Sequence, residues 1–450
     1  MLSMIEKNDL TSGSPLKKII TFSLPLVSGN VFQQFYTLID SFIISHFLGI
    51  NALAAVGAFY PLSFLILGFI QGCCIGFSIP LAQSIGRKDN VATKQDLLSG
   101  TIICCVLICI MTPSMIFSAQ PLLTLLHTPE RILTITTIFT IISFAGIPAN
   151  ILYNYSASLL RSFGDSTHPF HFLVFSLFLN IGLALTFILL FHLGLNGVAL
   201  ATVISETVAG LLNLYYYIHH TTFPKIKISR QYLNYQSLIH VSTIGFPMGA
   251  EYSVSAIGAI LMQNAINILG TDAIAAQSAG DKIRQFFTLP MESLGMGIAT
   301  YMAQNFGAHD KKRISQGLLD GSLIQLSWSI VSLLLVWLLK KPLITLVLGV
   351  SHGHVYNLAE NYLVTISFFF IIHGLLMIFR NTLQGLGHSM VAILSGFGEL
   401  IGRLFASILA TLSFGYVAIC YANQLAWGIS LVYCCYMVWK ILSTDHQLNK

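Results

Sequence analysis

Residues 48–55, LGINALAA, recur 221 positions later as residues 269–276, LGTDAIAA. Two further segments repeat at the same offset, namely 82–89 (AQSIGRKD) at 303–310 (AQNFGAHD) and 95–100 (QDLLSG) at 316–321 (QGLLDG). Three separated segments that share one offset indicate an internal duplication of the chain. Each copy is therefore expected to form a structural unit of similar fold.

The composition is typical of a membrane protein, because 55% of the residues are hydrophobic and only 9% are charged, against about 25% in soluble domains. Apolar segments long enough to cross a bilayer lie at 19–47, 53–83, 96–117, 131–160, 169–193, 196–219, 238–269, 273–304, 317–338, 357–382, 389–412 and 416–440. The sequence thus predicts an all-α integral membrane protein with twelve transmembrane helices, six per copy. An even number of spans gives both copies the same orientation, so the two six-helix lobes should be related by a pseudo-two-fold axis along the membrane normal.

The positive charges predict the topology, since Lys and Arg accumulate in cytoplasmic loops. With both termini in the cytoplasm, sixteen of the 22 Lys and Arg residues, Arg380 among them, fall on the cytoplasmic side, three fall outside and three lie within spans. We predict an N-lobe over residues 1–220, a cytoplasmic linker over 221–237 and a C-lobe over 238–450. This topology accounts for the net charge of +5, so no nucleic-acid partner is expected.

No residue pattern predicts a metal site, a disulfide or a cofactor. The eight cysteines lie within predicted spans and form no C-x-x-C motif, so they are interpreted as apolar packing residues. His352 and His354 offer two nitrogens without a Cys or a carboxylate at ligand spacing, which is too few for a metal site.

Six acidic residues lie within the predicted spans: Asp40, Glu206, Glu251, Asp281, Glu292 and Glu399. An uncompensated charge at this depth is costly, so each of them is protonated, paired or in contact with water. Glu399 lies four residues before Arg403, and Asp281 lies three residues before Arg284. These spacings place both members of a pair on one helix face and favour structural ion pairs.

Asp40 has no counterpart in the second copy, because the equivalent positions hold Leu261 and Met262. The second copy folds without this acid, which favours a functional role for Asp40 over a packing role. A carboxyl at this depth could bind and release a proton. Glu206 and Glu251 have no basic residue three or four positions away, so each either attracts a cation or fills a hydrogen-bonded structural role.

Seven segments, in order along nearly the whole chain, carry a family resemblance: FQQFYTLID (32–40), LAAVG (53–57), LYNY (152–155), LRSFGDS (160–166), AQNFGA (303–308), LQGLG (383–387) and ELIGR (399–403). With these segments the chain resembles the multidrug and toxic compound extrusion (MATE) family, in particular its bacterial DinF-like and MepA-like branch. The resemblance implies two lobes that open alternately to either side of the bacterial cytoplasmic membrane. It also implies export of amphipathic, often cationic drugs against an inward flow of protons or sodium.

The resemblance assigns Asp40 and Asn180 to cation coupling, and the sequence departs from the family pattern at three places. Ala184 stands where some members carry a second acid in the fifth helix, Glu206 where the branch usually carries Gln, and Ser255 where sodium-coupled members carry Glu. We therefore expect H+ as the coupling ion, with Na+ as the alternative. We hypothesise that Glu206 supplies the acid missing at position 184 and shares a proton with Asp40, so that the two carboxyls titrate as a pair.

Aromatic, Met, amide and charged side chains at membrane depth are candidates for substrate binding: Gln33, Gln34, Tyr36, Tyr153, Asn154, Glu251, Met262, Asn264, Lys282 and Met291. Met and aromatic side chains offer adaptable apolar contacts, and amides offer hydrogen bonds. Each of them could equally serve in packing between helices. Because one chain contains both lobes, a monomer is expected to function.

Three other function classes fit the sequence less well. A flippase for lipid-linked oligosaccharides, from a related transporter family, would need several cations to hold a pyrophosphate, and only Lys282, Arg284 and Arg403 qualify. An intramembrane enzyme would need a motif such as H-E-x-x-H, G-x-S-x-G or a phosphate loop, which the sequence lacks. A channel is the third class, but the duplicated lobes and the matched Pro25 and Pro247 favour alternating access.

Overall fold

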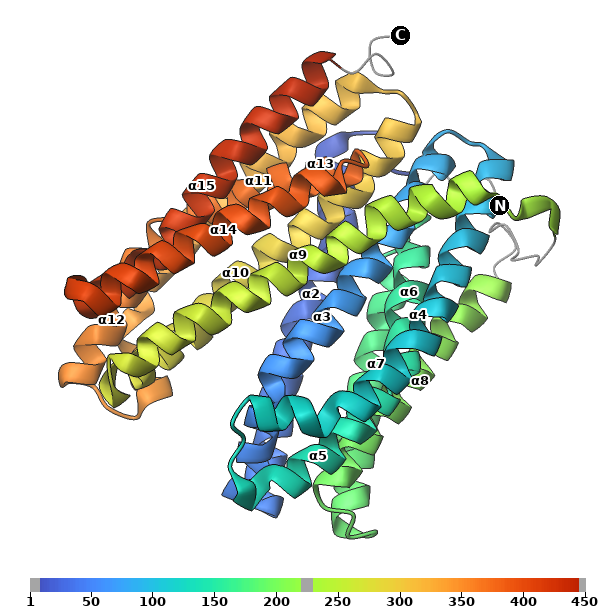
Figure 1. Cartoon of the computed structure of the whole chain (residues 1–450). Helices are drawn as coiled ribbons and strands as arrows, with labels where there is room; N and C mark the ends of the chain where they lie inside the picture. The colour runs from blue at the N-terminus through green and yellow to red at the C-terminus, as the bar shows by residue number, and fades with distance from the viewer. Residues whose placement is uncertain (1–8, 220–229, 445–450) are drawn as a thin grey trace. The chain divides into compact units, whose positions relative to one another are not determined.

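The computed structural model describes residues 9–219 and 230–444, and in these ranges the chain folds into α-helices without a β-strand (Figure 1). The first half contains α2 (Pro15–Ile43), α3 (Ile50–Gly86), α4 (Asn90–Leu125), α5 (Glu130–Ala145), α6 (Ile147–Ser162), α7 (Thr167–Leu189) and α8 (Leu195–His219). The second half contains α9 (Tyr235–Ile268), α10 (Thr271–Gly307), α11 (Lys311–Leu348), α12 (His354–Ser367), α13 (Phe370–Gly385), α14 (Ser389–Leu409) and α15 (Gly415–Thr444). Short π-helical turns follow α2 (Ile44–Leu48) and α14 (Ala410–Phe414), and a 3-10 turn (Arg230–Tyr232) precedes α9.

Eight of the described helices are long and apolar enough to cross a membrane, and two bent pairs bring the number to ten. The pairs are α5 with α6, bent by 43°, and α12 with α13, bent by 49°. The remaining long helices, α2 with 29 residues and α10 with 37, carry more polar side chains. Each of the twelve predicted spans overlaps one of these helices or bent pairs, and ten of them meet the length and hydropathy expected of a span. The sequence did not predict the bends, one of which coincides with Pro148 in the first turn of α6, where a missing N–H costs nothing.

The duplicated segments act as helix start signals in both halves. Gly49 and Gly270 have φ angles of 84° and 98° and directly precede α3 and α10, and glycine adopts this region without steric cost. Asp89 and Asp310 cap the next helices, because their carboxylates accept hydrogen bonds from backbone N–H groups in the first turns of α4 and α11. The repeat is thus conserved in backbone geometry as well as in sequence.

The described residues form two compact units, each with its own hydrophobic core. Unit 1 contains Ser28–Gly249, and unit 2 contains Leu10–Val27 together with the chain from Ala250 onward. The chain therefore changes unit inside α2 and again inside α9, in each case two residues after the proline at position 25 or 247. Each unit thus includes the beginning of the other half's first helix.

These bounds differ from the predicted lobes, which assigned all of residues 1–220 to one lobe and 238–450 to the other. Side chains explain the difference at the beginning of the chain, where Arg313 donates to the Gly13 carbonyl at 2.7 Å and the Leu10 N–H donates to Gln304 at 3.1 Å. At the start of α9, the Ser237 hydroxyl donates to Asp96 of α4 at 2.6 Å. Of the predicted linker 221–237, residues 221–229 lie outside the described ranges, as do residues 1–8 and 445–450 of the two termini.

Helices α3 and α9 approach each other closely inside unit 1 through two glycines. A Cβ atom added to Gly76 would lie 2.5 Å from the Cα of Gly245, and one added to Gly245 would lie 2.0 Å from the Phe77 ring. Small residues at such contacts let helix backbones pack directly on one another. The contact leaves no room for a side chain at position 76 of α3 or position 245 of α9.

We therefore expect Gly76→Ala to lower the melting temperature of the purified protein. Its methyl group would push against backbone rather than a flexible side chain, and overpacking of this kind costs about 1–3 kcal/mol. Gly57 lies on the same helix with nothing within 4 Å of its added Cβ, so Gly57→Ala is the matched control and should melt at or above the wild-type temperature. Equal melting of the two variants would contradict this packing.

Candidate functional site

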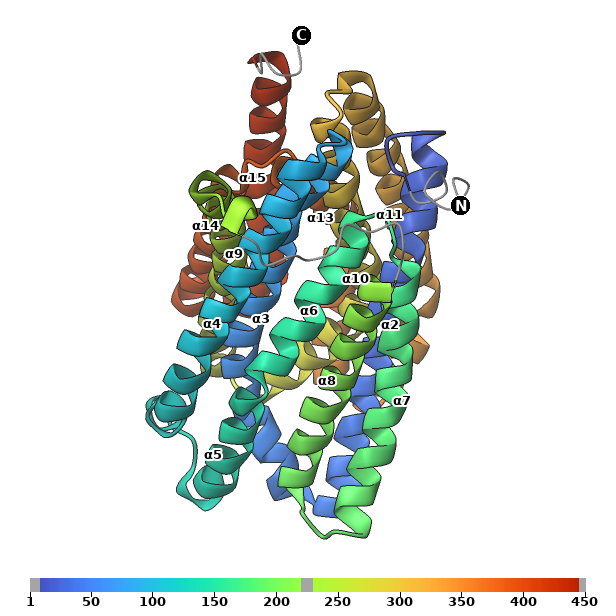
Figure 2. The ribbon, with the colours of Figure 1, turned by 90° about the vertical axis from the view of Figure 1, so that its right-hand side faces the viewer.

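A small polar cavity of about 100 Å³ lies inside unit 1. Four helices of this unit line it, and α7 and α8 pack side by side next to α2 (Figure 2). The lining residues are Gln33, Tyr36 and Thr37 of α2, Tyr153 of α6, Leu173, Ser176, Leu177 and Asn180 of α7, and Thr202, Ser205 and Glu206 of α8.

Asn180 joins α7 to α8 at this cavity. Its amide nitrogen donates to the hydroxyls of Thr202 and Ser205, both at 3.1 Å. The Ser176 hydroxyl, one turn earlier on α7, donates to the Ser205 carbonyl at 2.9 Å. The side-chain oxygen of Asn180 is buried and has no hydrogen-bond partner among the described residues, so it remains available to a donor or a cation inside the cavity.

Glu206 is held by an amide instead of a basic residue. The Asn150 amide nitrogen lies 3.3 Å from each carboxylate oxygen, and Asn154 donates to the Asn150 side chain at 3.1 Å. No Lys, Arg or His of the described ranges forms an ion pair with Glu206. An amide satisfies hydrogen bonds of the carboxylate but does not balance its charge.

Asp40 lies one turn beyond Tyr36 on α2, and its Oδ1 is buried without a hydrogen-bond partner in the described structure. The Tyr36 hydroxyl has no hydrogen bond of ordinary length among the described residues, but it faces Thr202 and Asn180 and lies near enough to Asp40 and Glu206 to interact electrostatically with both acids. The described residues thus place two acids and no basic side chain around one tyrosine. Such an arrangement attracts a proton or a metal cation.

The structure brings most of the first-lobe candidates together. Gln33, Tyr36, Tyr153, Asn180 and Glu206 all line the cavity. Asp40 lies beside it, Asn154 supports Asn150, and Gln34 is not among the lining residues. No hydrogen bond links Asp40 to Glu206 within the described ranges. The hypothesis that they share one proton therefore requires a relay through Tyr36 or a change of side-chain position.

Unit 2 has a buried network of charges. Arg380 of α13 contacts Glu251 of α9 at 2.9 Å and Glu399 of α14 at 2.7 Å. Glu399 also pairs with Arg403 at 3.1 Å, which confirms the predicted pair on α14. Arg403 reaches Asn423 of α15 at 3.2 Å. The network therefore ties four helices of unit 2 together.

A second network confirms the predicted pair of Asp281 and Arg284, which are 2.9 Å apart. Asp281 also accepts hydrogen bonds from Tyr362 at 2.7 Å and from Gln277 at 2.9 Å. The Tyr416 hydroxyl donates to Gln277 at 3.0 Å. These contacts connect α10 with α12 and α15.

Three residues predicted to bind substrate, Glu251, Met262 and Met291, form contacts within unit 2 that the sequence did not reveal. The carboxylate oxygens of Glu251 are used by Arg380 and by Gln384, which donates at 2.7 Å. Met291 has no exposed surface, and Met262 retains only 8% of its surface. Both methionines pack in hydrophobic clusters of unit 2, so they offer little to a substrate in this conformation.

Asn264 and Lys282 are exposed on α9 and α10. Their assignment to substrate binding stays a prediction. Sequence reasoning missed the roles of two residues: Arg380, which the charge distribution assigns to the cytoplasmic side, and Asn150, which lies 56 positions from Glu206. Only the apolar context of α13 could have indicated that Arg380 is buried.

Among the described residues no group of three or more His, Cys, Asp or Glu side chains could hold a metal ion.

Comparison with known proteins places the chain in a family. A family model described as MatE matches residues 25–186 and 247–423. The chain is 28% identical to the "Probable multidrug resistance protein YpnP" of Bacillus subtilis (strain 168) over 84% of either chain, and 26% identical to the "FAD transporter" of Shewanella oneidensis over 70% of this chain and 71% of that one. A solved structure titled "Outward-facing conformation of a multidrug resistance MATE family transporter of the MOP superfamily" aligns with a TM-score of 0.89 at 19% identity, covering 96% of this chain and 97% of the other. This likeness confirms the predicted fold class, and the two matched ranges show that the chain belongs to the MatE family.

Proposed function

We propose that the protein exports amphipathic, often cationic compounds from the cell in exchange for protons that move inward. MatE family members are transporters, not enzymes. Relatives named multidrug resistance protein or multidrug export protein support the substrate class. The relative named FAD transporter suggests an alternative substrate class, because FAD is an anion. FAD uptake therefore serves as the competing outcome in the experiment.

The observation that carries the coupling proposal is the uncompensated acidity of unit 1. Asp40 has a buried oxygen without a partner among the described residues, and Glu206 has only an amide. A cation or a proton that enters this site lowers the cost of burying these charges. The cavity of about 100 Å³ is far below the roughly 300–1,000 Å³ of drug-sized sites. We therefore assign it to the coupling ion and its water, with Gln33, Tyr36 and Tyr153 at its edge available to the substrate.

Coupling requires that each ligand prefers one conformation. In the outward-open state a proton enters from outside, neutralises Asp40 and favours release of the drug. In the inward-open state Asp40 releases the proton, and its charge favours binding of a cationic compound from the cytoplasm. The two ligands thus exclude each other through the charge of one carboxyl.

We favour the proton over sodium because the described residues of unit 2 offer no unpaired acid at the position where sodium-coupled members carry Glu. Ser255 occupies that position, and Glu251, one turn earlier, is neutralised by Arg380. We further propose that one chain is sufficient and lies in the bacterial cytoplasmic membrane, with both termini inside, as the distribution of Lys and Arg predicts.

The proposal is tested with inverted membrane vesicles that contain the wild-type protein. Vesicles energised by a proton gradient should accumulate ethidium, and each addition of ethidium should release protons that a pH-sensitive dye detects. A proton ionophore should abolish accumulation, and a sodium gradient should not restore it. Uptake that is driven by sodium alone would overturn the choice of ion, and uptake of FAD with no uptake of ethidium would overturn the choice of substrate.

A further inference from the structure

His373 of α13 is a buried histidine without a hydrogen bond. It retains 5% of its surface, and neither ring nitrogen has a hydrogen-bond partner among the described residues. A neutral imidazole always carries one N–H donor and one acceptor nitrogen. Leaving buried polar groups unpaired costs about 1–3 kcal/mol, so a purely structural role would be better filled by an apolar ring.

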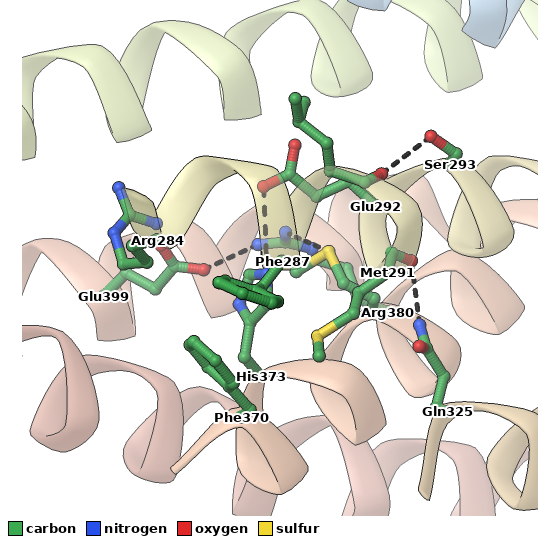
Figure 3. Close-up of polar contacts among 12 residues, drawn as sticks. Arg284, Phe287, Met291, Glu292, Ser293, Gln325, Phe370, His373, Arg380 and Glu399 are labelled. Carbon is green, nitrogen blue, oxygen red and sulfur yellow. Dashed lines mark hydrogen bonds and ion pairs between the residues drawn. The ribbon is translucent and has the colours of Figure 1, made fainter. Parts of the chain in front are cut away.

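Glu292 of α10 points toward this ring (Figure 3). Its Oε1 lies 3.7 Å from His373 Nε2, which is within ion-pair range but too long for a hydrogen bond. The side chain of Glu292 is 45% exposed, whereas that of His373 is 6% exposed. Glu292 is therefore the more accessible member of the pair, and a small rotation of its side chain would close the gap to a hydrogen bond.

Two further elements contact the ring. Trp427 of α15 lies 4.4 Å away between ring centroids at an angle of 42°, so its π-face can stabilise a charged imidazole. The other charged groups that face His373 are Glu399 of α14, which attracts a proton to the ring, and Arg284 of α10, which opposes it. Each of these two already has an opposite charge in contact, Arg380 for Glu399 and Asp281 for Arg284.

The charged groups around His373 in unit 2 include one more acid than arginine. Of the residues that the structure describes in this region, three arginines face four acids: Arg284, Arg380 and Arg403 against Asp281, Glu251, Glu399 and Glu292. The three arginines form ion pairs with the first three acids. Among the described residues, Glu292 is within ion-pair distance of His373 alone, and it interacts with Arg284 at longer range. Lys282, next to Asp281 on α10, is exposed and forms no ion pair in the described structure. A single proton held by His373 and Glu292 would therefore make the region neutral.

We propose that His373 and Glu292 form a second proton-binding site, located in unit 2 and independent of Asp40. The proton enters through the exposed carboxyl of Glu292 and is shared with Nε2 of His373, so the two groups titrate as a pair. The site adds to the proposed function, because antiport would then involve a proton in each unit. Proton binding at this pair does not itself require that antiport is correct.

Nuclear magnetic resonance of the purified full-length protein, labelled with 15N in its fourteen histidines, tests the site directly. Comparison with His373→Gln identifies the His373 signal. In the wild type this signal should show a protonation step between about pH 5 and 8, the range in which histidines commonly titrate. In Glu292→Gln, which keeps the size of the side chain and affects a half-exposed position, the step should move or vanish.

Two variants serve as controls. Glu130→Gln removes an exposed acid at the start of α5 in unit 1 and should leave the His373 titration unchanged. Asp40→Asn should also leave it unchanged, because the proposed site is independent of the first. A His373 signal that stays constant over the whole pH range, or one whose step is identical in Glu292→Gln, would overturn the proposal. Failure of drug-driven proton movement in vesicles would instead refute antiport and leave this titration to be judged on its own.

Discussion

Replacement of Arg380 with glutamine is expected to prevent stable folding of unit 2. The change would leave Glu251 without an ion pair and would remove one of the two basic partners of Glu399, although these carboxylates are only 6% and 5% exposed. Removal of one member of a buried ion pair costs about 3–5 kcal/mol. Since the whole stability of a protein is about 5–15 kcal/mol, we expect a large drop in melting temperature and in the yield of monodisperse protein.

Fluorescence-detected size-exclusion chromatography with a thermal ramp measures this effect. Lys340→Gln is the matched control, because it breaks a pair with Glu360 whose side chains are 27% and 24% exposed, and pairs of this kind contribute at most about 1 kcal/mol. Arg380→Lys should be intermediate, because one ammonium cannot reproduce the fork that reaches two carboxylates. Combining Arg380→Gln with Glu251→Gln should recover part of the stability. Wild-type melting of Arg380→Gln would refute the assignment of the network as a structural element.

Replacement of Asp40 with asparagine is expected to abolish drug-dependent proton movement while leaving the fold intact. Asparagine has nearly the size of aspartate but cannot bind and release a proton. It also removes a charge that has a buried, unpartnered oxygen in the described structure, so the variant should be at least as stable as the wild type. In energised inverted vesicles at matched expression, proton release on ethidium addition should fall to the level of vesicles without the protein.

Asp272→Asn is the control for this measurement, because this acid lies exposed in the first turn of α10 and has no role in the proposed cycle. Binding of ethidium to purified protein, followed by fluorescence polarisation, separates loss of coupling from loss of binding. Undiminished proton movement in Asp40→Asn would place the coupling acid elsewhere, with Glu206 as the next candidate in the same cavity.

The sequence predicted the features that depend on local spacing. The internal duplication was predicted from the repeated segments, and the structure adds that their glycines precede helices at Gly49 and Gly270 and their aspartates cap helices at Asp89 and Asp310. The pairs of Asp281 with Arg284 and of Glu399 with Arg403 were predictable because three or four residues make one turn of helix.

Contacts between distant segments were not predictable in this way. The partner of Glu251 is Arg380, and its second donor, Gln384, lies 133 positions away. Spacing on one helix carries no information about such pairs. The burial of Met291 was missed for a related reason, because a membrane helix with apolar residues on several faces does not indicate which face meets lipid and which meets another helix.

The exchange of chain between the units at residues 27–28 and 249–250 bears on how a duplicated protein of this kind arose. Neither half of the chain forms a complete unit by itself. The first turns of α2 belong to unit 2, and the first turns of α9 belong to unit 1, so each unit needs a segment from the other half. A single-copy ancestor would have met the same requirement by forming a homodimer with reciprocally swapped first helices. Fusion of two copies in one chain would turn this intermolecular exchange into an intramolecular one, so that the two copies no longer need identical polar residues.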